Sequence, residues 1–321
     1  MGLNGYVVIG SAIVGLLVGL TGAGGGALMT PMLILLFSVK PAAAISSDLV
    51  AAVVMRPVGA LVHLRKGTVN LRLAGLMTLG SVPMAFLGAW LLKQLGDTSS
   101  SQQNVEIALG AALLVGAAAM VVRFFMDRKS GPRTAKLDEV TIRPVPTVLI
   151  GMVGGLVVGM TSVGSGSLMI VLLLFAYPKL AAGRLVGTDL TQAVPLTAAA
   201  ALGALAFGHV EFGVTASIIV GSVPAVLIGS LFSSRARDSY IRPTITFVIL
   251  ASGLKYIGLG TYPLAWTMGA VLVVAGGYWL ARTQPWRRAE PEAGRPQARG
   301  PAPEVTGIVP EIEPLDGTTV R

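Results

Sequence analysis

The sequence predicts an all-α polytopic membrane protein with two inverted repeats and one extra C-terminal transmembrane helix. Each repeat is expected to hold a broken, re-entrant helix followed by three transmembrane helices. Three observations lead to this fold class: the apolar composition, a set of motifs that occurs twice, and the positions of the basic residues. Hydrophobic residues make up 53% of the 321 residues and charged residues only 12%, whereas a soluble domain carries about 25% charged residues.

The first apolar run, residues 3–37, contains no charged residue and is too long for a single crossing. A helix rises about 1.5 Å per residue and needs about 20 residues to cross a bilayer. Four glycines fall within five positions, at Gly22, Gly24, Gly25 and Gly26, and each costs about 1 kcal/mol relative to alanine inside a helix. We therefore expect the run to break into two arms, residues 3–20 and 27–37.

The remaining apolar segments predict the other helices. In the first repeat they lie at 42–64, 71–95 and 105–125. The second repeat starts with another broken run, 145–177, and continues with helices at 184–208, 212–233 and 241–259, before an unmatched helix at 264–281. The expected division is a first repeat at 1–126, a cytoplasmic linker at 127–143, a second repeat at 144–260, the extra helix at 261–282, and a polar, disordered cytoplasmic tail at 283–321.

The two halves of the chain align with almost no gaps. The segment TGAGGGALM at Thr21–Met29 corresponds to TSVGSGSLM at Thr161–Met169, at an offset of 140. At an offset of 141, Ser-Asp-Leu at 47–49 corresponds to Thr-Asp-Leu at 188–190, and Gly-Ser-Val-Pro occurs at both 80–83 and 221–224. Such self-similarity at one spacing indicates an internal duplication.

The basic residues decide between parallel and inverted repeats. They cluster at 65–72, 128–143, 179–184, 235–242 and 282–288. If each broken run crossed the membrane once, the clusters would fall on both sides, against the positive-inside rule. If each run is a re-entrant hairpin, all clusters and the C-terminus are cytoplasmic. Each repeat then has an odd number of crossings, so the second is inverted and the two glycine tips meet near the midplane.

The two breaks are the expected binding site. A break inside a bilayer frees backbone N–H and C=O groups, so it must be buried in protein or line a watery cavity. The positive ends of the second arms suit an anion. The predicted substrate-binding residues are Thr21, Gly22, Gly24, Gly25, Gly26, Arg56, Thr161, Ser162, Gly164, Ser165, Gly166, Ser167 and Gln192. The alternative for the glycines is close helix packing alone.

Three of the charged residues within the apolar segments are candidates for the site. Asp48 and Asp189 occupy equivalent places near the starts of the helices that follow the hairpins. A carboxylate there is costly and marks a pathway or a proton relay, so both are candidates for proton coupling; helix N-capping is the alternative. Arg56 would either attract an anion or pair with Asp48, about two turns earlier, although the second copy has Thr197 at this place.

The composition excludes several classes of protein. There is no cysteine, and the two histidines are far apart, so thiolate catalysis and Cys- or His-rich metal centres are not expected. We predict no enzyme activity, no cofactor and no metal. The net charge of +9 comes from basic loops, which orient a membrane protein, so nucleic acid is not an expected partner. The expected partners are a small anion and the lipid bilayer; a proton as co-substrate and a homo-oligomer stay open.

Together these motifs resemble the TauE/SafE family of sulfite exporter-like membrane permeases. The resemblance rests on Gly22 to Gly26 followed by Pro31, on the two Asp-Leu segments and on the two Gly-Ser-Val-Pro segments, and it covers residues 7–258. It implies a secondary transporter of the bacterial inner membrane that carries a sulfur-containing anion, such as sulfite or an organosulfonate, with export as the expected direction. Alternating access around the two breaks is the expected mechanism. An anion channel, a carrier of another small organic acid and a non-transporting membrane partner remain alternatives.

Overall fold

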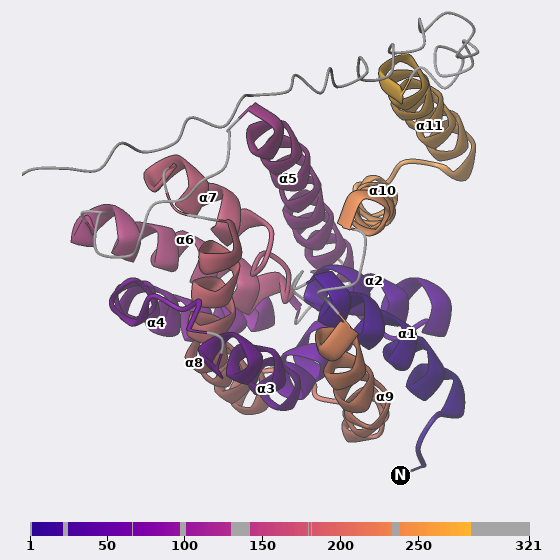
Figure 1. Ribbon diagram of the computed structural model, residues 1–321. Coiled ribbons are helices and arrows are strands. Elements are labelled where there is room, and N and C mark those ends of the chain that lie inside the picture. The colour runs from indigo at the N-terminus through magenta and orange to yellow at the C-terminus, as the bar shows by residue number, and fades with distance from the viewer. Residues whose placement is uncertain are drawn as a thin grey trace, which may run out of the picture. The chain divides into compact units, whose positions relative to one another are not determined.

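The computed structural model describes residues 2–21, 25–65, 67–96, 101–129, 142–178, 180, 182–232 and 238–283. In these residues the chain forms eleven helices and no strand, as shown in Figure 1. They are α1 (Gly5–Thr21), α2 (Gly26–Phe37), α3 (Pro41–Arg65), α4 (Leu71–Gly96), α5 (Ser101–Lys129), α6 (Pro144–Thr161), α7 (Leu168–Ala176), α8 (Ala182–Phe207), α9 (Phe212–Phe232), α10 (Asp238–Tyr256) and α11 (Thr261–Thr283). The chain divides into two units, residues 1–268 and 269–321.

The predicted all-helical fold and the predicted order of helices are confirmed. Most ends fall within three residues of the expected ones, but α5 is longer at both ends than the expected 105–125. Hydropathy marks only the apolar centre of this helix, whereas its polar ends continue the same backbone hydrogen bonding. Most of the expected linker, residues 130–141, and nearly all of the expected tail, residues 284–321, lie outside the described residues.

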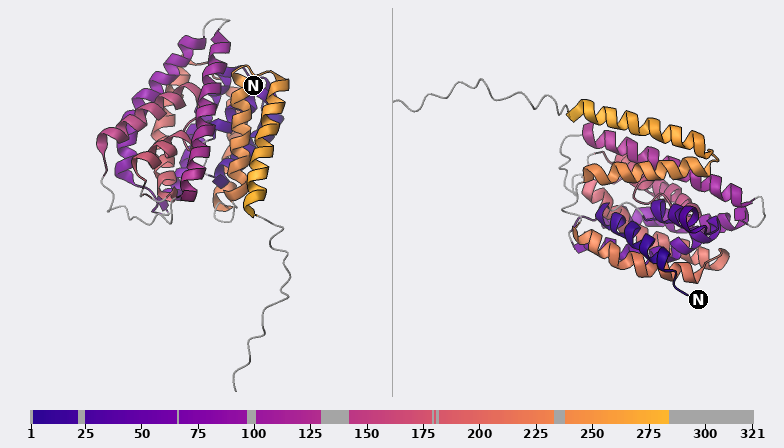
Figure 2. Two further views of the ribbon diagram at one scale, coloured as in Figure 1. Left: turned by 90° about the horizontal axis from the view of Figure 1, so that it is seen from above. Right: turned by 90° about the vertical axis from the view of Figure 1, so that its right-hand side faces the viewer.

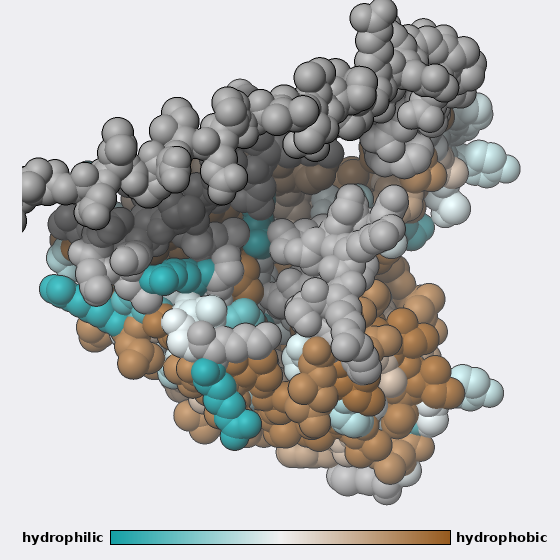
Figure 3. All heavy atoms as spheres, viewed as in Figure 1, coloured by the Kyte–Doolittle hydropathy of each residue, from teal (hydrophilic) through white to brown (hydrophobic). Residues whose placement is uncertain are grey.

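The exposed surface of the helices is suited to lipid. Among the described helices, α3, α4, α5, α6, α8 and α9 are long and apolar enough to cross a membrane. Many large apolar side chains are exposed, and on the face in Figure 3 the coloured surface is mostly hydrophobic. Such extensive apolar exposure is not found on soluble monomers. The chain is a multi-pass membrane protein.

Both broken runs fold back as hairpins. In the first, Gly10 of α1 lies against Met32 and Phe37 of α2, whereas Gly25 at the break lies near Val18. In the second, the Tyr177 hydroxyl after α7 accepts a hydrogen bond from the Arg143 backbone N–H before α6, at 3.0 Å. Each pair of arms is therefore antiparallel, with its open ends together and the glycine-rich break at the tip.

The first arm of each hairpin packs against the fourth helix of the other half of the chain. The most extensive helix contacts are α1 with α9 and α4 with α6, and Figure 1 shows both pairs side by side. The close approaches correspond residue by residue: Gly15 lies against Ser222 and Gly155 against Ser81. Since Gly15 is equivalent to Gly155 and Ser81 to Ser222, the two interfaces are copies of each other.

Equivalent helices that touch each other run in opposite directions. In α5 and α10, Gly110 lies against Tyr256, whereas Met120 accepts a hydrogen bond from the Thr246 hydroxyl at 3.4 Å. In α3 and α8, Ser46 lies against Gly208 and His63 against Gly187. A two-fold axis perpendicular to the helices produces antiparallel pairs, whereas an axis along the helices produces parallel ones. This geometry supports the inverted-repeat interpretation, and Figure 2 shows α5 and α10 running alongside each other.

The copied interfaces depend on glycines that allow backbones to touch. A methyl group at Gly19 would overlap the carbonyl of Val226, and one at Gly159 would overlap the carbonyl of Ala85. At Gly75, which is also helical, an added methyl group would meet no atom within 4 Å. The three positions therefore differ in packing although all are helical.

We expect Gly19→Ala and Gly159→Ala each to destabilise the protein by about 1–3 kcal/mol, as overpacking does. Gly75→Ala should be neutral or stabilising, because alanine favours a helix by about 1 kcal/mol. Thermal unfolding midpoints of the purified variants in detergent test this expectation. Equal midpoints for all three variants would contradict the close packing of α1 on α9 and of α6 on α4.

Candidate functional site

The two hairpin tips lie directly against each other. A methyl group at Gly26, the first residue of α2, would overlap the backbone carbonyl and the hydroxyl of Ser162, the residue that ends α6. These residues come from opposite halves of the chain, and both are buried. The contact requires a glycine at position 26, and it brings the positive N-terminal end of α2 to the tip of the second hairpin.

The tip of the second hairpin has a backbone that only special residues adopt easily. Ser162 has φ 59°, Gly164 has φ 122° and Gly166 has φ 86°. The left-handed region is open to glycine and strained for most other residues. This local conformation ends α6 and lets α7 begin again at Leu168 after a sharp reversal. The small residues of TSVGSGSLM are therefore needed for the reversal itself.

Asp48 of α3 binds both hairpins. Its Oδ2 accepts a hydrogen bond from the Ser162 hydroxyl at 2.7 Å and another from the Thr30 hydroxyl of α2 at 3.0 Å. The side chain is only 1% exposed. A carboxylate from the first half is thus held by the tip of the second hairpin and by the second arm of the first.

Asp189 of α8 binds the other side of the same tip. Its Oδ2 accepts a hydrogen bond from the backbone N–H of Gly166 at 2.6 Å, and its Oδ1 accepts one from the Gln192 amide at 3.1 Å. Gln192 in turn accepts a hydrogen bond from the Ser81 hydroxyl of α4 at 3.1 Å. The second hairpin therefore contacts both carboxylates, one through a hydroxyl and one through the backbone.

Arg56 brings positive charge to this centre, and Arg123 of α5 also acts on Asp189. Arg56 is 6% exposed, and its charge interacts with both Asp48 and Asp189. Its Nε and Nη2 atoms are buried and have no hydrogen-bond partner in the described part of the chain. Unpartnered guanidinium N–H groups are rare in a protein interior, and an arginine in a membrane span marks a pathway for a charged ligand.

The structure excludes helix capping for the two aspartates. Their helices begin at Pro41 and Ala182, so Asp48 and Asp189 lie about two turns inside them. Among the described residues, no hydrogen bond joins either one to the first turn of its own helix, and both bind the tip of the second hairpin. The expectation that Arg56 pairs directly with Asp48 is also not met, since its charge acts on both carboxylates without a hydrogen bond to either.

The structure brings most of the predicted site residues together. Arg56, Ser162, Gly166 and Gln192 belong to the network around Asp48 and Asp189, and Gly26 lies at the tip contact. Four more predicted residues are buried at the second tip, although no hydrogen bond joins them to the carboxylates: Thr161, Gly164, Ser165 and Ser167. The Thr161 hydroxyl donates to the Val157 carbonyl at 2.6 Å. Gly25 packs near Met55 of α3. Gly22, Gly24 and the side chain of Thr21 lie outside the described residues.

Two residues of the network were not predicted from the sequence. Thr30 is a hydroxyl in the charge-free second arm of the first hairpin, and Ser81 belongs to the first Gly-Ser-Val-Pro segment. The repeated motif was a signal for Ser81, but it did not show what the serine binds. Thr30 has Ile170 at the equivalent place, so the duplication gives no indication of its role.

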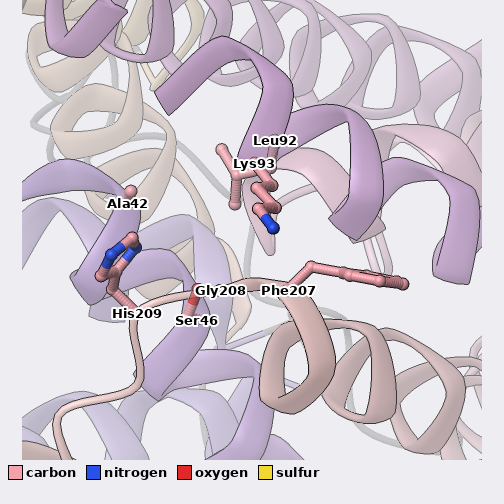
Figure 4. Close-up of a pocket in the computed structure, with 7 residues that line it drawn as sticks. All are labelled: Ala42, Ser46, Leu92, Lys93, Phe207, Gly208 and His209. Atoms are coloured by element: carbon pink, nitrogen blue, oxygen red, sulfur yellow. The ribbon is translucent and has the colours of Figure 1, made fainter. Parts of the chain in front are cut away.

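A small pocket lies at the start of α3, away from the centre. Ala42 and Ser46 line it with Leu92 and Lys93 of α4 and with residues 207–209 after α8, as Figure 4 shows. Its free volume is about 10 Å³, which is room for about one water molecule. None of the predicted substrate-binding residues lines it, so it is not the site of the hairpin tips.

Comparison with known proteins gives the family. The chain is 37% identical over 252 residues to "Probable membrane transporter protein YjnA" of Bacillus subtilis (strain 168), which covers 78% of this chain and 98% of the relative. It is 23% identical to "Probable membrane transporter protein YdhB" of the same organism, over 77% of this chain and 98% of the relative. It is 27% identical to a "Probable membrane transporter protein" of Xylella fastidiosa (strain Temecula1), over 73% of this chain and 86% of the relative. No solved structure matches the chain. Residues 7–256 match the family model "Sulfite exporter TauE/SafE", and the chain belongs to this family of membrane transporters.

Proposed function

We propose that this protein is a secondary transporter that carries a small sulfur-containing anion, such as sulfite or an organosulfonate, through the centre formed by the hairpin tips. The observation that carries the proposal is Arg56, whose buried Nε and Nη2 have no partner although its charge interacts with two carboxylates. An anion placed at these donors would form charge-assisted hydrogen bonds, which are stronger than neutral ones. The family name is consistent with a sulfur oxyanion as the substrate.

The charges of the centre favour a proton as co-substrate. Arg56 and Arg123 of α5 both act on Asp189, so with both arginines charged and both carboxylates ionised the four groups are neutral in sum. Each proton bound by a carboxylate adds one positive charge, so a protonated centre binds an anion more tightly than the ionised centre does. Because Coulomb energies are large in a poorly solvated interior, this change is sufficient to couple anion binding to proton binding.

The two hairpins provide a means of alternating access. Gly26 and Ser162 close the centre where the tips touch, and the hairpins belong to halves that pack as copies of each other. Separation of one tip at a time would open the centre to one face and then to the other. We place the protein in the bacterial inner membrane, with the C-terminus in the cytoplasm and the first hairpin entering from outside. The loop at Lys40 then faces the outside, and the loop after Arg65 faces the cytoplasm.

The test is counterflow in liposomes. Purified protein is reconstituted with unlabelled sulfite inside, and uptake of external labelled sulfite is measured under nitrogen, with protein-free liposomes as the blank. We expect saturable uptake that depends on internal substrate. Gly26→Ala should lower it at least about tenfold, because the new methyl group blocks the tip contact. Gly59→Ala on α3, which meets no atom within 4 Å, should retain it.

The outcomes separate the alternatives. Flux that never saturates and needs no internal substrate would indicate an anion channel. Exchange of a carboxylate but of no sulfur anion would indicate a carrier of another organic acid. If a folded protein moved none of these anions, the proposal would be wrong and a non-transporting membrane partner would be favoured.

A further inference from the structure

The two equivalent aspartates differ in one hydrogen-bond bridge. In the second half, the Gln192 amide donates to Asp189 Oδ1 and accepts from the Ser81 hydroxyl, both at 3.1 Å. The residue equivalent to Gln192 is Ala51, and the residue equivalent to Ser81 is Ser222. A methyl group can neither donate nor accept, so the first half has no such bridge.

The missing bridge leaves two polar atoms available in the first half. Ser222 is 0% exposed, and its Oγ has no hydrogen-bond partner. Both side-chain hydrogen bonds to Asp48, from Thr30 and Ser162, reach Oδ2. Among the described residues, no hydrogen bond reaches Asp48 Oδ1, the atom equivalent to the one that Gln192 binds. The Ser222 hydroxyl is a buried polar atom without a partner, and such atoms are uncommon and call for an explanation.

The packing of helices in one half repeats that in the other, and this repetition indicates that Ser222 Oγ and Asp48 Oδ1 lie on the same side of α3. The Asn70 backbone N–H donates to the Thr188 hydroxyl at 3.0 Å, and the equivalent Glu211 N–H donates to the Ser47 hydroxyl at 3.1 Å. The helix α3 contacts α9 as α8 contacts α4. Ala51 also belongs to one buried cluster with Ile218 and Val226, which lie one turn before and after Ser222 on α9. From this equivalence we infer that Ala51 faces α9 near Ser222, as Gln192 faces Ser81 of α4.

We propose that the transported anion itself completes this bridge in the first half. It takes the place that the Gln192 amide has in the second half, with a donor toward Asp48 Oδ1, an acceptor toward the Ser222 hydroxyl, and its charge toward Arg56. The ligand class is a small oxyanion that carries an O–H group beside its charged oxygens, of which hydrogensulfite is the simplest sulfur example. This inference rests on the proposed function and narrows its substrate.

The first experiment puts the missing amide into the chain. Ala51→Gln should abolish saturable sulfite counterflow while keeping or raising the unfolding midpoint, because the new amide binds Asp48 and Ser222 as Gln192 binds Asp189 and Ser81. Ala51→Leu, similar in size but without polar atoms, should also block exchange but lower the midpoint, as overpacking does. Wild-type exchange by Ala51→Gln, or a midpoint no higher than that of Ala51→Leu, would overturn the inference.

The second experiment does not depend on the folding of those variants. Ser222→Ala removes only the hydroxyl and should raise the half-saturating sulfite concentration about tenfold, the usual effect of losing one hydrogen bond to a charged group. Ser230→Ala is the control, because this hydroxyl on the same helix donates to the Leu227 carbonyl of its own turn. It should leave the half-saturating concentration unchanged. An equal effect of both variants, or no effect of Ser222→Ala, would contradict the bridge.

The ligand class is tested by competition on the wild-type protein. Unlabelled methanesulfinate, which has a methyl group where hydrogensulfite has its O–H, should inhibit labelled sulfite counterflow at least about tenfold more weakly than unlabelled sulfite does. Equal inhibition would show that Asp48 Oδ1 does not accept a hydrogen bond from an O–H group of the anion. The conclusion that the protein transports sulfite would still stand. Absence of sulfite counterflow by the wild-type protein would instead refute the proposed function, so the two failures are distinguishable.

Discussion

Replacement of Arg56 by glutamine is expected to lower saturable anion counterflow by about a hundredfold. Its two buried, unpartnered donors, Nε and Nη2, are the groups available to the substrate. A hydrogen bond to a charged group contributes about 1.5–3 kcal/mol, so the loss of the donors and of the charge removes at least about 3 kcal/mol, or two factors of ten. The measurement is counterflow at matched amounts of reconstituted protein.

The control for this prediction lies on the same helix. Arg65 is exposed at the end of α3, so Arg65→Gln makes the same chemical change outside the centre and should leave exchange within about twofold. Arg56→Gln should lower the unfolding midpoint, because it leaves two buried carboxylates without the charge that compensates them, so exchange is compared at matched amounts of folded protein. Normal exchange by a folded Arg56→Gln protein would exclude Arg56 from the binding site.

Replacement of Asp48 or Asp189 by asparagine is expected to change how exchange depends on pH. Asparagine keeps a hydrogen-bond acceptor for the donors of the hairpin tips but fixes the side chain in an uncharged form. Wild-type exchange should fall as the pH rises, because both carboxylates then ionise and the centre loses the positive charge that favours an anion. Asp189→Asn should keep exchange at a pH where the wild type has lost it, with one fewer proton in the dependence, about tenfold less change per pH unit. Asp48→Asn should show the same smaller dependence but a higher half-saturating concentration, because its amide NH2 takes the place of the oxygen proposed to accept from the anion.

The readout of this prediction is the ratio of variant to wild-type exchange at each pH, which cancels the titration of sulfite itself. The double variant should lose the pH dependence that the two carboxylates cause and should no longer use a proton gradient to concentrate the anion. Glu106→Gln on α5 is the control, since this carboxylate is outside the network. Wild-type pH profiles in both single variants would remove Asp48 and Asp189 from proton coupling.

The helices and the hairpin tips could be predicted from the sequence because their signals are local. Charge-free runs too long for one crossing, with clustered glycines, are enough to place breaks near Gly25 and Gly164. The motif offsets of 140 and 141 identify equivalent residues, so Asp48 and Asp189 stand out together. The length of α5 was underestimated because hydropathy measures lipid exposure and not helix formation at polar ends.

The contacts across the centre could not be predicted, because they join segments far apart in the chain. Equivalence between two halves says which residues correspond, but it does not say which ones touch. Ser162 binds Asp48 of the other half, and Gly22 stands at the equivalent place in the first repeat. Such asymmetry follows from side chains that differ between the copies. It is also the source of the substrate bridge proposed at Ala51 and Ser222.

The most direct test of alternating access uses one cysteine at the second hairpin tip. The natural chain has no cysteine, so Ser165→Cys can be labelled alone with a membrane-impermeant thiol reagent, added separately to either face of reconstituted vesicles of known orientation. Lys40→Cys and Arg65→Cys are the side markers, each expected to react from one face only and from opposite faces. We predict that the cysteine at position 165 reacts from both faces, as the two hairpin tips open in turn. Reaction from one face only, or from neither, would contradict a carrier whose site lies where the tips meet.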